Sequence, residues 1–161
     1  MHVAEQTFLA PERVLSAACD FSERRALLWP DVHVEHLRVH EIGEAFADVT
    51  EGNPSELGLI WERMRYDWSE PGLVKGTVVD SNIFGPGSTW ELRVTPTDGG
   101  SRVDLIAVRN PRGVKGFVIE AYIRLGVARR VVRNHLRHFL STLEREIEGD
   151  ARGRDDAHDR S

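Results

Sequence analysis

Cysteine is nearly absent from this chain, and its scarcity excludes two classes of protein. Cys19 is the single cysteine among 161 residues, so the chain can form no internal disulfide and no thiolate metal site. No run of about 18 apolar residues could cross a bilayer, and the amino terminus lacks a basic segment followed by an apolar one. We therefore expect a cytoplasmic protein with no transmembrane segment, held together by its own hydrophobic core.

Basic residues are also in deficit. The chain has 21 Lys and Arg against 26 Asp and Glu, a formal net charge of -5, which argues against a surface built for nucleic acid. We expect no DNA partner and a monomer or weak homodimer. The length suits one core. We predict one domain over residues 1–148 and a disordered polar tail over 149–161, because alanine is the only apolar residue in that tail.

The spacing of apolar residues changes once along the chain. Residues 3–9 are typical of a strand, and two short helices are predicted between Pro11 and Pro30. From Val32 to Arg109, alternating segments separated by Gly, Pro, Asn and Asp predict an antiparallel meander of about six strands. Residues 112–148 carry apolar side chains three and four apart, which predicts one long helix with a weak point at Gly126.

Three boundary motifs pace nearly the whole chain: Ala10-Pro11-Glu12-Arg13-Val14, Trp29-Pro30-Asp31-Val32, and the turn Thr95-Pro96-Thr97-Asp98-Gly99-Gly100-Ser101-Arg102-Val103. With the order of the elements, they resemble the START/Bet v 1-like SRPBCC superfamily, and most closely its polyketide cyclase/dehydrase and lipid transport group. The resemblance implies an α+β helix-grip fold: a curved antiparallel sheet of about seven strands wrapped on a long carboxy-terminal helix, with two short helices after the first strand.

The resemblance also implies a function, since members of this superfamily hold lipids, sterols, hormones or polyketides between sheet and helix. The sequence is thus expected to bind a small hydrophobic or aromatic molecule, with no cofactor. An alternative is a polyketide aromatase/cyclase that uses acid-base groups in the cavity. A second alternative is an interaction protein that associates with ribosomes or lipid.

The segment Trp61-Glu62-Arg63-Met64-Arg65-Tyr66-Asp67-Trp68 points to the cavity wall. Alternation places Glu62, Met64, Tyr66 and Trp68 on one face of a strand and the charged residues between them on the other. A buried Glu62 would have a raised pKa and could act as a general acid or base. A bulge that turns Glu62 into water is the competing interpretation.

For the cyclase alternative, the candidate catalytic residues are Glu62, Tyr66 and Arg109, with Arg109 steadying an enolate; a surface ion pair of Arg109 is the competing interpretation. Plain core packing competes with ligand contact for each apolar candidate. The candidate ligand-binding residues are Met64, Trp68, Trp90, Leu92, Leu105, Phe117, Ala121 and Tyr122.

Histidines and arginines supply two further patterns. His33, His36 and His40 cannot converge on one strand face, and His135 and His138 lack further ligands, so we predict no metal site. A run of arginines makes the middle of the long helix basic. Its default interpretation is a solvated face, and the alternative is contact with anionic lipid, a phosphate-bearing carrier or RNA. The run comprises Arg124, Arg129, Arg130, Arg133 and Arg137.

Overall fold

One antiparallel sheet forms the body of the protein. The computed structural model describes residues 1–56 and 58–158, with side chains as far as residue 149. Within these residues the sheet has seven strands in the order β1-β7-β6-β5-β4-β3-β2. The strands are β1 (His2–Thr7), β2 (Arg38–Ile42), β3 (Phe46–Ser55), β4 (Gly58–Asp67), β5 (Leu73–Ser81), β6 (Thr89–Thr97) and β7 (Gly100–Val108).

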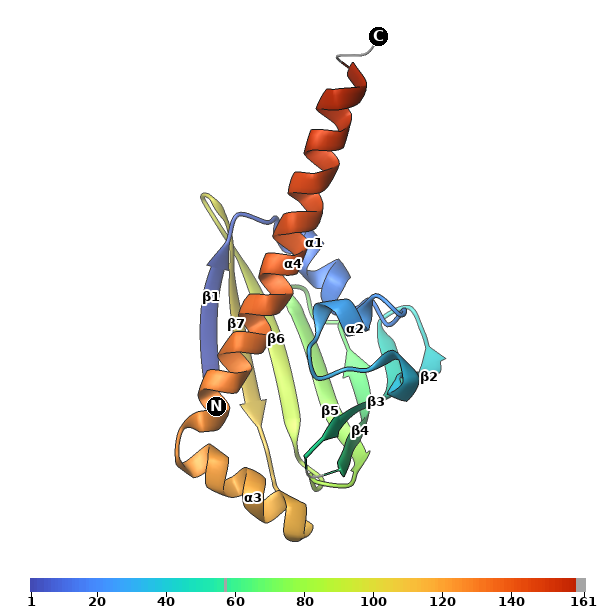
Figure 1. Ribbon diagram of the computed structural model, residues 1–161, viewed down its shortest axis with the longest axis vertical. Coiled ribbons are helices and arrows are strands. Elements are labelled where there is room, and N and C mark those ends of the chain that lie inside the picture. Colours follow the sequence, from blue (N-terminus) through green and yellow to red (C-terminus); the bar gives the residue numbers. More distant parts are fainter. Residues whose placement is uncertain (57, 159–161) are drawn as a thin grey trace.

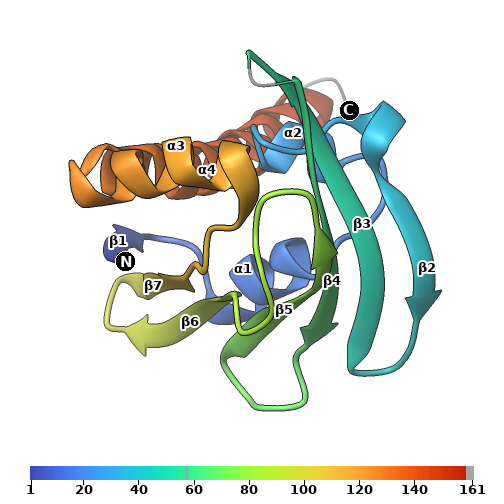
Figure 2. The ribbon, with the colours of Figure 1, turned by 90° about the horizontal axis from the view of Figure 1, so that it is seen from below.

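Helices cover only one face of this sheet. Figure 1 shows α4 lying across the sheet and projecting beyond it, and Figure 2 shows the sheet curving beneath α3 and α4. The curvature follows from the twist between neighbouring strands. The helices are α1 (Pro11–Ala18), α2 (Arg25–Leu28), the 3-10 turn η1 (Val34–His36), α3 (Gly113–Arg124) and α4 (Val127–His158). The helix-grip architecture and the six-stranded meander β2–β7 predicted from sequence are confirmed.

The carboxy-terminal helix is not continuous from residue 112. Gly126 has a φ of +74°, in the left-handed region that glycine adopts without steric penalty. The predicted weak point is therefore a break that separates α3 from α4. The backbone of α4 continues as helix to His158, past the predicted boundary at Glu148; a helix that has already nucleated extends readily through alanine and charged residues. The domain boundary at Glu148 stays a prediction.

Strand β4 keeps the predicted alternation. Met64 and Tyr66 are buried, whereas Arg63 and Arg65 face outward. The register shift near Arg63 falls on the partner strand, where β5 pairs Asp80 and then Val78 with successive residues of β4. The bulge that would have turned Glu62 outward is therefore in β5, and Glu62 keeps the inner face.

An aromatic cluster fills the middle of the space between sheet and helices. Trp29 stacks on Phe139 of α4 with ring centroids 4.5 Å apart, and it lies 5.8 Å from Trp90 of β6. Tyr66 meets Trp90 edge to face and Phe21 at 4.8 Å. Rings in these geometries contribute about 0.5–1.5 kcal/mol per pair beyond the area that they bury. The middle of the grip is thus solid core.

Arg25 lies at the inner edge of this cluster and is only 1% exposed. Its guanidinium forms an ion pair with Glu51 of β3 and donates hydrogen bonds to the hydroxyl of Tyr66 (3.1 Å) and the carbonyl of Ala18 (3.0 Å). The Tyr66 hydroxyl in turn donates to Glu51 at 2.7 Å. Glu51 holds the pKa of Arg25 above its ordinary value despite burial, so this cation is permanent and must stay paired.

We expect loss of Arg25 to be strongly destabilising. Arg25→Ala leaves the Glu51 carboxylate without its cationic partner and should lower the free energy of unfolding by about 3–5 kcal/mol, measured by urea denaturation. The double variant Arg25→Met/Glu51→Gln removes both charges and should recover part of that loss. Arg63→Ala, which breaks a pair with Asp48 whose arginine is 41% exposed, is the matched control and should lose much less stability than Arg25→Ala. Equal losses in Arg25→Ala and Arg63→Ala would contradict the buried-pair interpretation.

Candidate functional site

A cavity of about 510 Å³ opens between the sheet and the two carboxy-terminal helices. We call it the outer chamber. Its wall is mostly apolar, and α3, α4 and the β5–β6 connection each contribute to it. Its volume falls in the range of about 300–1,000 Å³ that is typical of small-molecule sites. The lining side chains include Ile60, Glu62, Ile83, Phe84, Arg109, Ile119, Tyr122, Ile123, Val127, Ala128, Val131, Val132 and His135.

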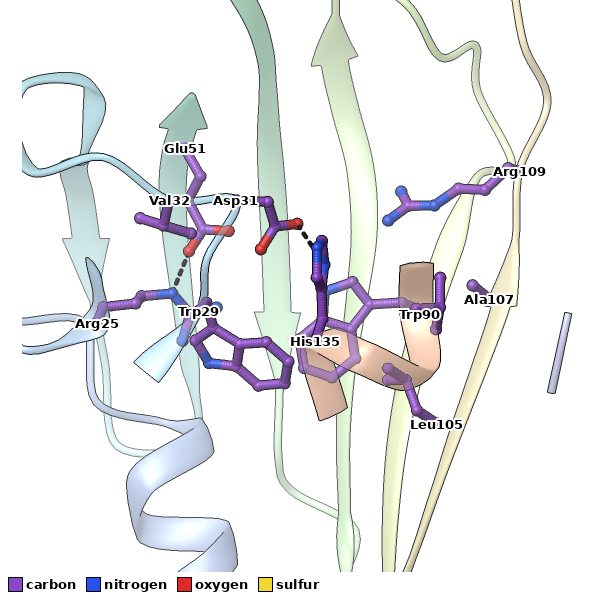
Figure 3. A pocket seen from close by; sticks show the side chains of 11 residues that line it. Arg25, Trp29, Asp31, Val32, Glu51, Trp90, Leu105, Ala107, Arg109 and His135 are labelled. Carbon is purple, nitrogen blue, oxygen red and sulfur yellow. Dashed lines mark hydrogen bonds and ion pairs between the residues drawn. The ribbon is translucent and has the colours of Figure 1, made fainter. Parts of the chain in front are cut away.

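A narrower space of about 70 Å³, the inner recess, continues from the chamber toward the aromatic cluster. Four residues line both spaces: Asp31, Arg109, Val132 and His135. Figure 3 shows Arg109 reaching from β7 toward the recess, with Trp90 and Leu105 on the sheet side and Trp29 near the Arg25–Glu51 pair. The site therefore has a wide apolar part and a small polar end.

Glu62 and Arg109 meet at the wall of the outer chamber. An Arg109 guanidinium nitrogen donates to Glu62 Oε2 at 2.7 Å, and both side chains are largely buried. Arg109 also lies over the ring of Phe84, 4.7 Å from its centroid. Burial, helped by repulsion from Asp31 and Glu51, raises the pKa of Glu62 above its ordinary value, and the attraction of Arg109 opposes this rise. Glu62 and Arg109, predicted separately from the sequence as candidate site residues, thus line the chamber together.

Asp31 and His135 complete the polar end. Asp31 follows α2 and faces His135 of α4, whose Nδ1 lies 3.7 Å from a carboxylate oxygen of Asp31 (Figure 3). The contact is longer than a hydrogen bond. Because Asp31 is about half exposed, a polar group of a bound molecule could reach both side chains. The recess therefore offers a guanidinium, carboxylates and an imidazole within a small volume.

Tyr66, the third predicted catalytic residue, is fully buried and lines neither the chamber nor the recess. Its hydroxyl is already engaged with Arg25 and Glu51. Burial and the nearby Glu51 carboxylate raise the pKa of Tyr66 well above its ordinary value. This position corrects the sequence-based expectation that Tyr66 faces the ligand, because alternation identifies the buried face of a strand and not which part of it stays open.

The predicted ligand-binding residues divide into three groups. Tyr122 lines the outer chamber, and Trp90 and Leu105 line the recess. Met64 and Leu92 are core residues that line neither space. The other three lie elsewhere, which corrects their expected position.

Trp68 lines a separate groove between α1 and the start of β5, and its ring stacks on Phe21 with centroids 6.1 Å apart. Phe117 and Ala121 are exposed on α3. The break at Gly126 rotates α3 out of the stripe that a continuous helix would have presented to the sheet.

Sequence reasoning found Arg109 but missed the other residues of the polar end. Asp31 stands inside the Trp29-Pro30-Asp31-Val32 boundary motif, and the spacing of His135 from His138 raises only the question of a metal ligand. Glu51 and Arg25 carried no distinguishing pattern, since each stands in an ordinary strand or helix context. Only a buried-charge requirement could have linked them, and burial of a charged residue is not visible in a single sequence.

Metal and thiol chemistry find no support in the described residues. Among the side chains that the structure describes, those of residues 1–56 and 58–149, no three His, Cys, Asp or Glu group in a way that could hold a metal ion. Burial raises the pKa of the Cys19 thiol to about 11, so this thiol stays protonated at neutral pH and is a poor nucleophile.

Comparisons with known proteins place this geometry among solved folds. No protein-family model matches the sequence, and no curated protein matches it. A Thermus thermophilus protein, TTHA0849, superposes with a TM-score of 0.70 at 14% identity, over 93% of this chain and 97% of its own. The Zhui aromatase/cyclase from Streptomyces sp. R1128 gives 0.67 at 16% identity, over 91% and 95%.

A START superfamily protein from Mycobacterium smegmatis superposes with a TM-score of 0.64 at 11% identity, over 89% of this chain and 97% of that one. At these identities the likeness concerns the path of the backbone. Together with the sheet order and the helix that crosses it, it identifies the architecture: the protein has the helix-grip fold of the START/Bet v 1 superfamily.

Proposed function

We propose that this protein binds a small, mostly hydrophobic or aromatic molecule in the outer chamber, with a polar group of that molecule in the inner recess. One observation carries the proposal: a cavity of about 510 Å³ with an apolar wall narrows to an end lined by Arg109, Asp31 and His135. Apolar walls supply affinity through burial of the ligand, and a few converging polar groups fix its orientation.

The side chains that line the chamber and the recess indicate where the apolar and the polar parts of a ligand would lie. Ile83 on the β5–β6 connection, Ile119 and Ile123 on α3, and Val131 on α4 present aliphatic surface to a ring system or acyl chain. Arg109 favours an oxygen acceptor, such as a carbonyl, enolate or carboxylate. Asp31 favours a hydroxyl. A polyketide or an oxygenated lipid meets both demands.

A second candidate function is cyclisation of a poly-β-ketone, favoured by the Glu62–Arg109 pair. A carboxyl with a raised pKa can exchange a proton with a carbon acid, and an adjacent guanidinium stabilises the enolate that forms. Both groups line the chamber, and the Zhui aromatase/cyclase has the same fold. The two candidates share one ligand site and differ only in whether Glu62 moves a proton.

Filling the chamber should abolish binding. Ala128→Trp on α4 places an indole in the chamber and should weaken binding of the neutral fluorescent probe N-phenyl-1-naphthylamine by at least about tenfold, or about 1.4 kcal/mol. Fluorescence titration measures this. Ala121→Trp, on the exposed side of α3, is the matched control and should bind like the parent. If Ala128→Trp and the parent bind the probe with equal affinity, the outer chamber is not the binding site.

Glu62→Gln separates carrier from cyclase. The amide keeps the shape of the side chain and a hydrogen-bonding group near Arg109, so affinity for the probe should change by less than about threefold, well under 1.4 kcal/mol. If the protein is a cyclase, conversion of a poly-β-ketone substrate, followed by chromatography of the products, should fall by about 100-fold or more. Unchanged turnover in this variant would exclude Glu62 as the acid-base group. If the parent protein shows no turnover, the cyclase function is excluded and ligand binding without chemistry remains.

The raised pKa of Glu62 also predicts a pH dependence of stability. The folded protein holds the proton of this carboxyl at a higher pH than the unfolded chain, whose Glu62 titrates near the ordinary value of 4.5. Stability contributed by the neutral carboxyl is therefore present below that pH and is lost as pH rises through the folded-state pKa. Urea denaturation at stepped pH should show a flatter decline in Glu62→Gln than in the parent; identical profiles would contradict the shift.

A further inference from the structure

Helix α3 is apolar on two sides. Its inner side contributes Ile119, Tyr122 and Ile123 to the outer chamber. Its outer side and its end carry side chains three and four positions apart that face away from the protein, so they form one stripe. We call this stripe the α3 outer face: Val114, Phe117, Val118, Ala121 and Leu125.

The α3 outer face is strongly exposed. Val114 is 89% exposed, Phe117 77% and Leu125 76%. A helix that is apolar on both sides is normally covered on both, and a contiguous exposed apolar patch marks an interaction surface. At 12 residues α3 is too short to cross a bilayer, which takes about 20. None of the helices in the described part of the chain is long and apolar enough for that either.

The segment around this face is basic, although the protein is acidic. Residues 112–133 contain six Lys and Arg and one Glu, which gives this segment a charge of +5. Because the net charge of the whole chain is -5, the other residues together carry -10. Arg129 and Arg130 make no ion pair among the side chains that the structure describes. The side chain of Arg124 is 78% exposed. Exposed arginines therefore stand at the end of α3 and in the first turn of α4, within a few residues of Leu125.

We propose that the α3 outer face docks on an anionic lipid surface, with its apolar side chains in the interfacial layer and Arg124, Arg129 and Arg130 on lipid phosphates. Short amphipathic segments that combine exposed bulky apolar residues with Lys and Arg bind membranes in this way. A second copy of the chain would bring one +5 segment against another, which disfavours self-association. RNA would satisfy the arginines and leave Val114, Phe117 and Leu125 uncovered.

The position of α3 gives this docking a consequence for the cavity. The same helix lines the outer chamber on the side that faces the exterior, and Val127 and Val131 continue the chamber wall just beyond the break at Gly126. A lipid surface that covers α3 therefore lies next to the chamber. This position would let a hydrophobic molecule pass between the chamber and the bilayer, an inference that rests on the proposed function. The docking of α3 itself does not depend on that function.

Vesicle flotation tests the docking. The parent protein should float with vesicles of phosphatidylcholine plus phosphatidylglycerol, should not float with phosphatidylcholine alone, and should be released by added salt. Val114→Asp/Leu125→Asp places charges on the α3 outer face and should lower partitioning by at least about tenfold. Arg129→Glu/Arg130→Glu should lower it by a similar factor through loss of lipid attraction.

Leu27→Asp is the matched control, because Leu27 of α2 is 65% exposed and lies outside this segment; it should float like the parent. Probe binding in the outer chamber by Val114→Asp/Leu125→Asp reports that this variant is folded and separates loss of docking from loss of the ligand site. No flotation of the parent with anionic vesicles would overturn the proposal. An equally low flotation of Leu27→Asp and Val114→Asp/Leu125→Asp would also overturn it. So would a parent that forms a dimer, binds no vesicles and is dissociated by Val114→Asp/Leu125→Asp.

Discussion

The buried guanidinium of Arg25 determines where this fold is solid and where it is open. Its ion pair with Glu51 and its hydrogen bond to Tyr66 tie α2 to β3 and β4 at the inner end of the recess. A buried cation tolerates no movement that would leave it unpaired, because the desolvation penalty then has no compensation. The aromatic rings pack around this fixed point, and the remaining space collects at the other end, beneath α3 and the start of α4.

The break at Gly126 decides the shape of that space. A continuous helix would have carried the apolar stripe of residues 112–148 straight along the sheet, with Phe117 and Ala121 pointing inward. The left-handed turn at Gly126 instead rotates α3, so that Ile119, Tyr122 and Ile123 line the outer chamber and Phe117 faces outward. One backbone conformation thus produces both the chamber wall and the exposed apolar stripe beside it.

The polar side chains of the chamber and recess come from segments that are far apart in the sequence. Arg109 ends the inward set of β7, Glu62 keeps the inner face of β4 because the bulge falls in β5, and His135 comes from α4. Arg109 and Glu62 carry opposite charges, which lets them stay close together with little exposure to water and still offer hydrogen bonds to a bound molecule. Ligand binding and proton transfer would both use the Glu62–Arg109 pair, so the chemistry of the bound molecule decides which of the two occurs.

Local patterns were enough for the architecture. The turn residues between strands, the alternation of Met64 and Tyr66, and the change of period after Pro111 each follow from short-range sterics and burial, which a single sequence records. Alternation also placed Glu62 on the inner face. Tertiary packing alone decides which inward-facing residues line the cavity. The hydroxyl of Tyr66 is engaged by Arg25 and Glu51, whereas Glu62, four residues before it on the same face, lines the outer chamber. Cavities arise from the mismatch between a twisted sheet and a broken helix, and that mismatch depends on contacts between segments distant in the chain.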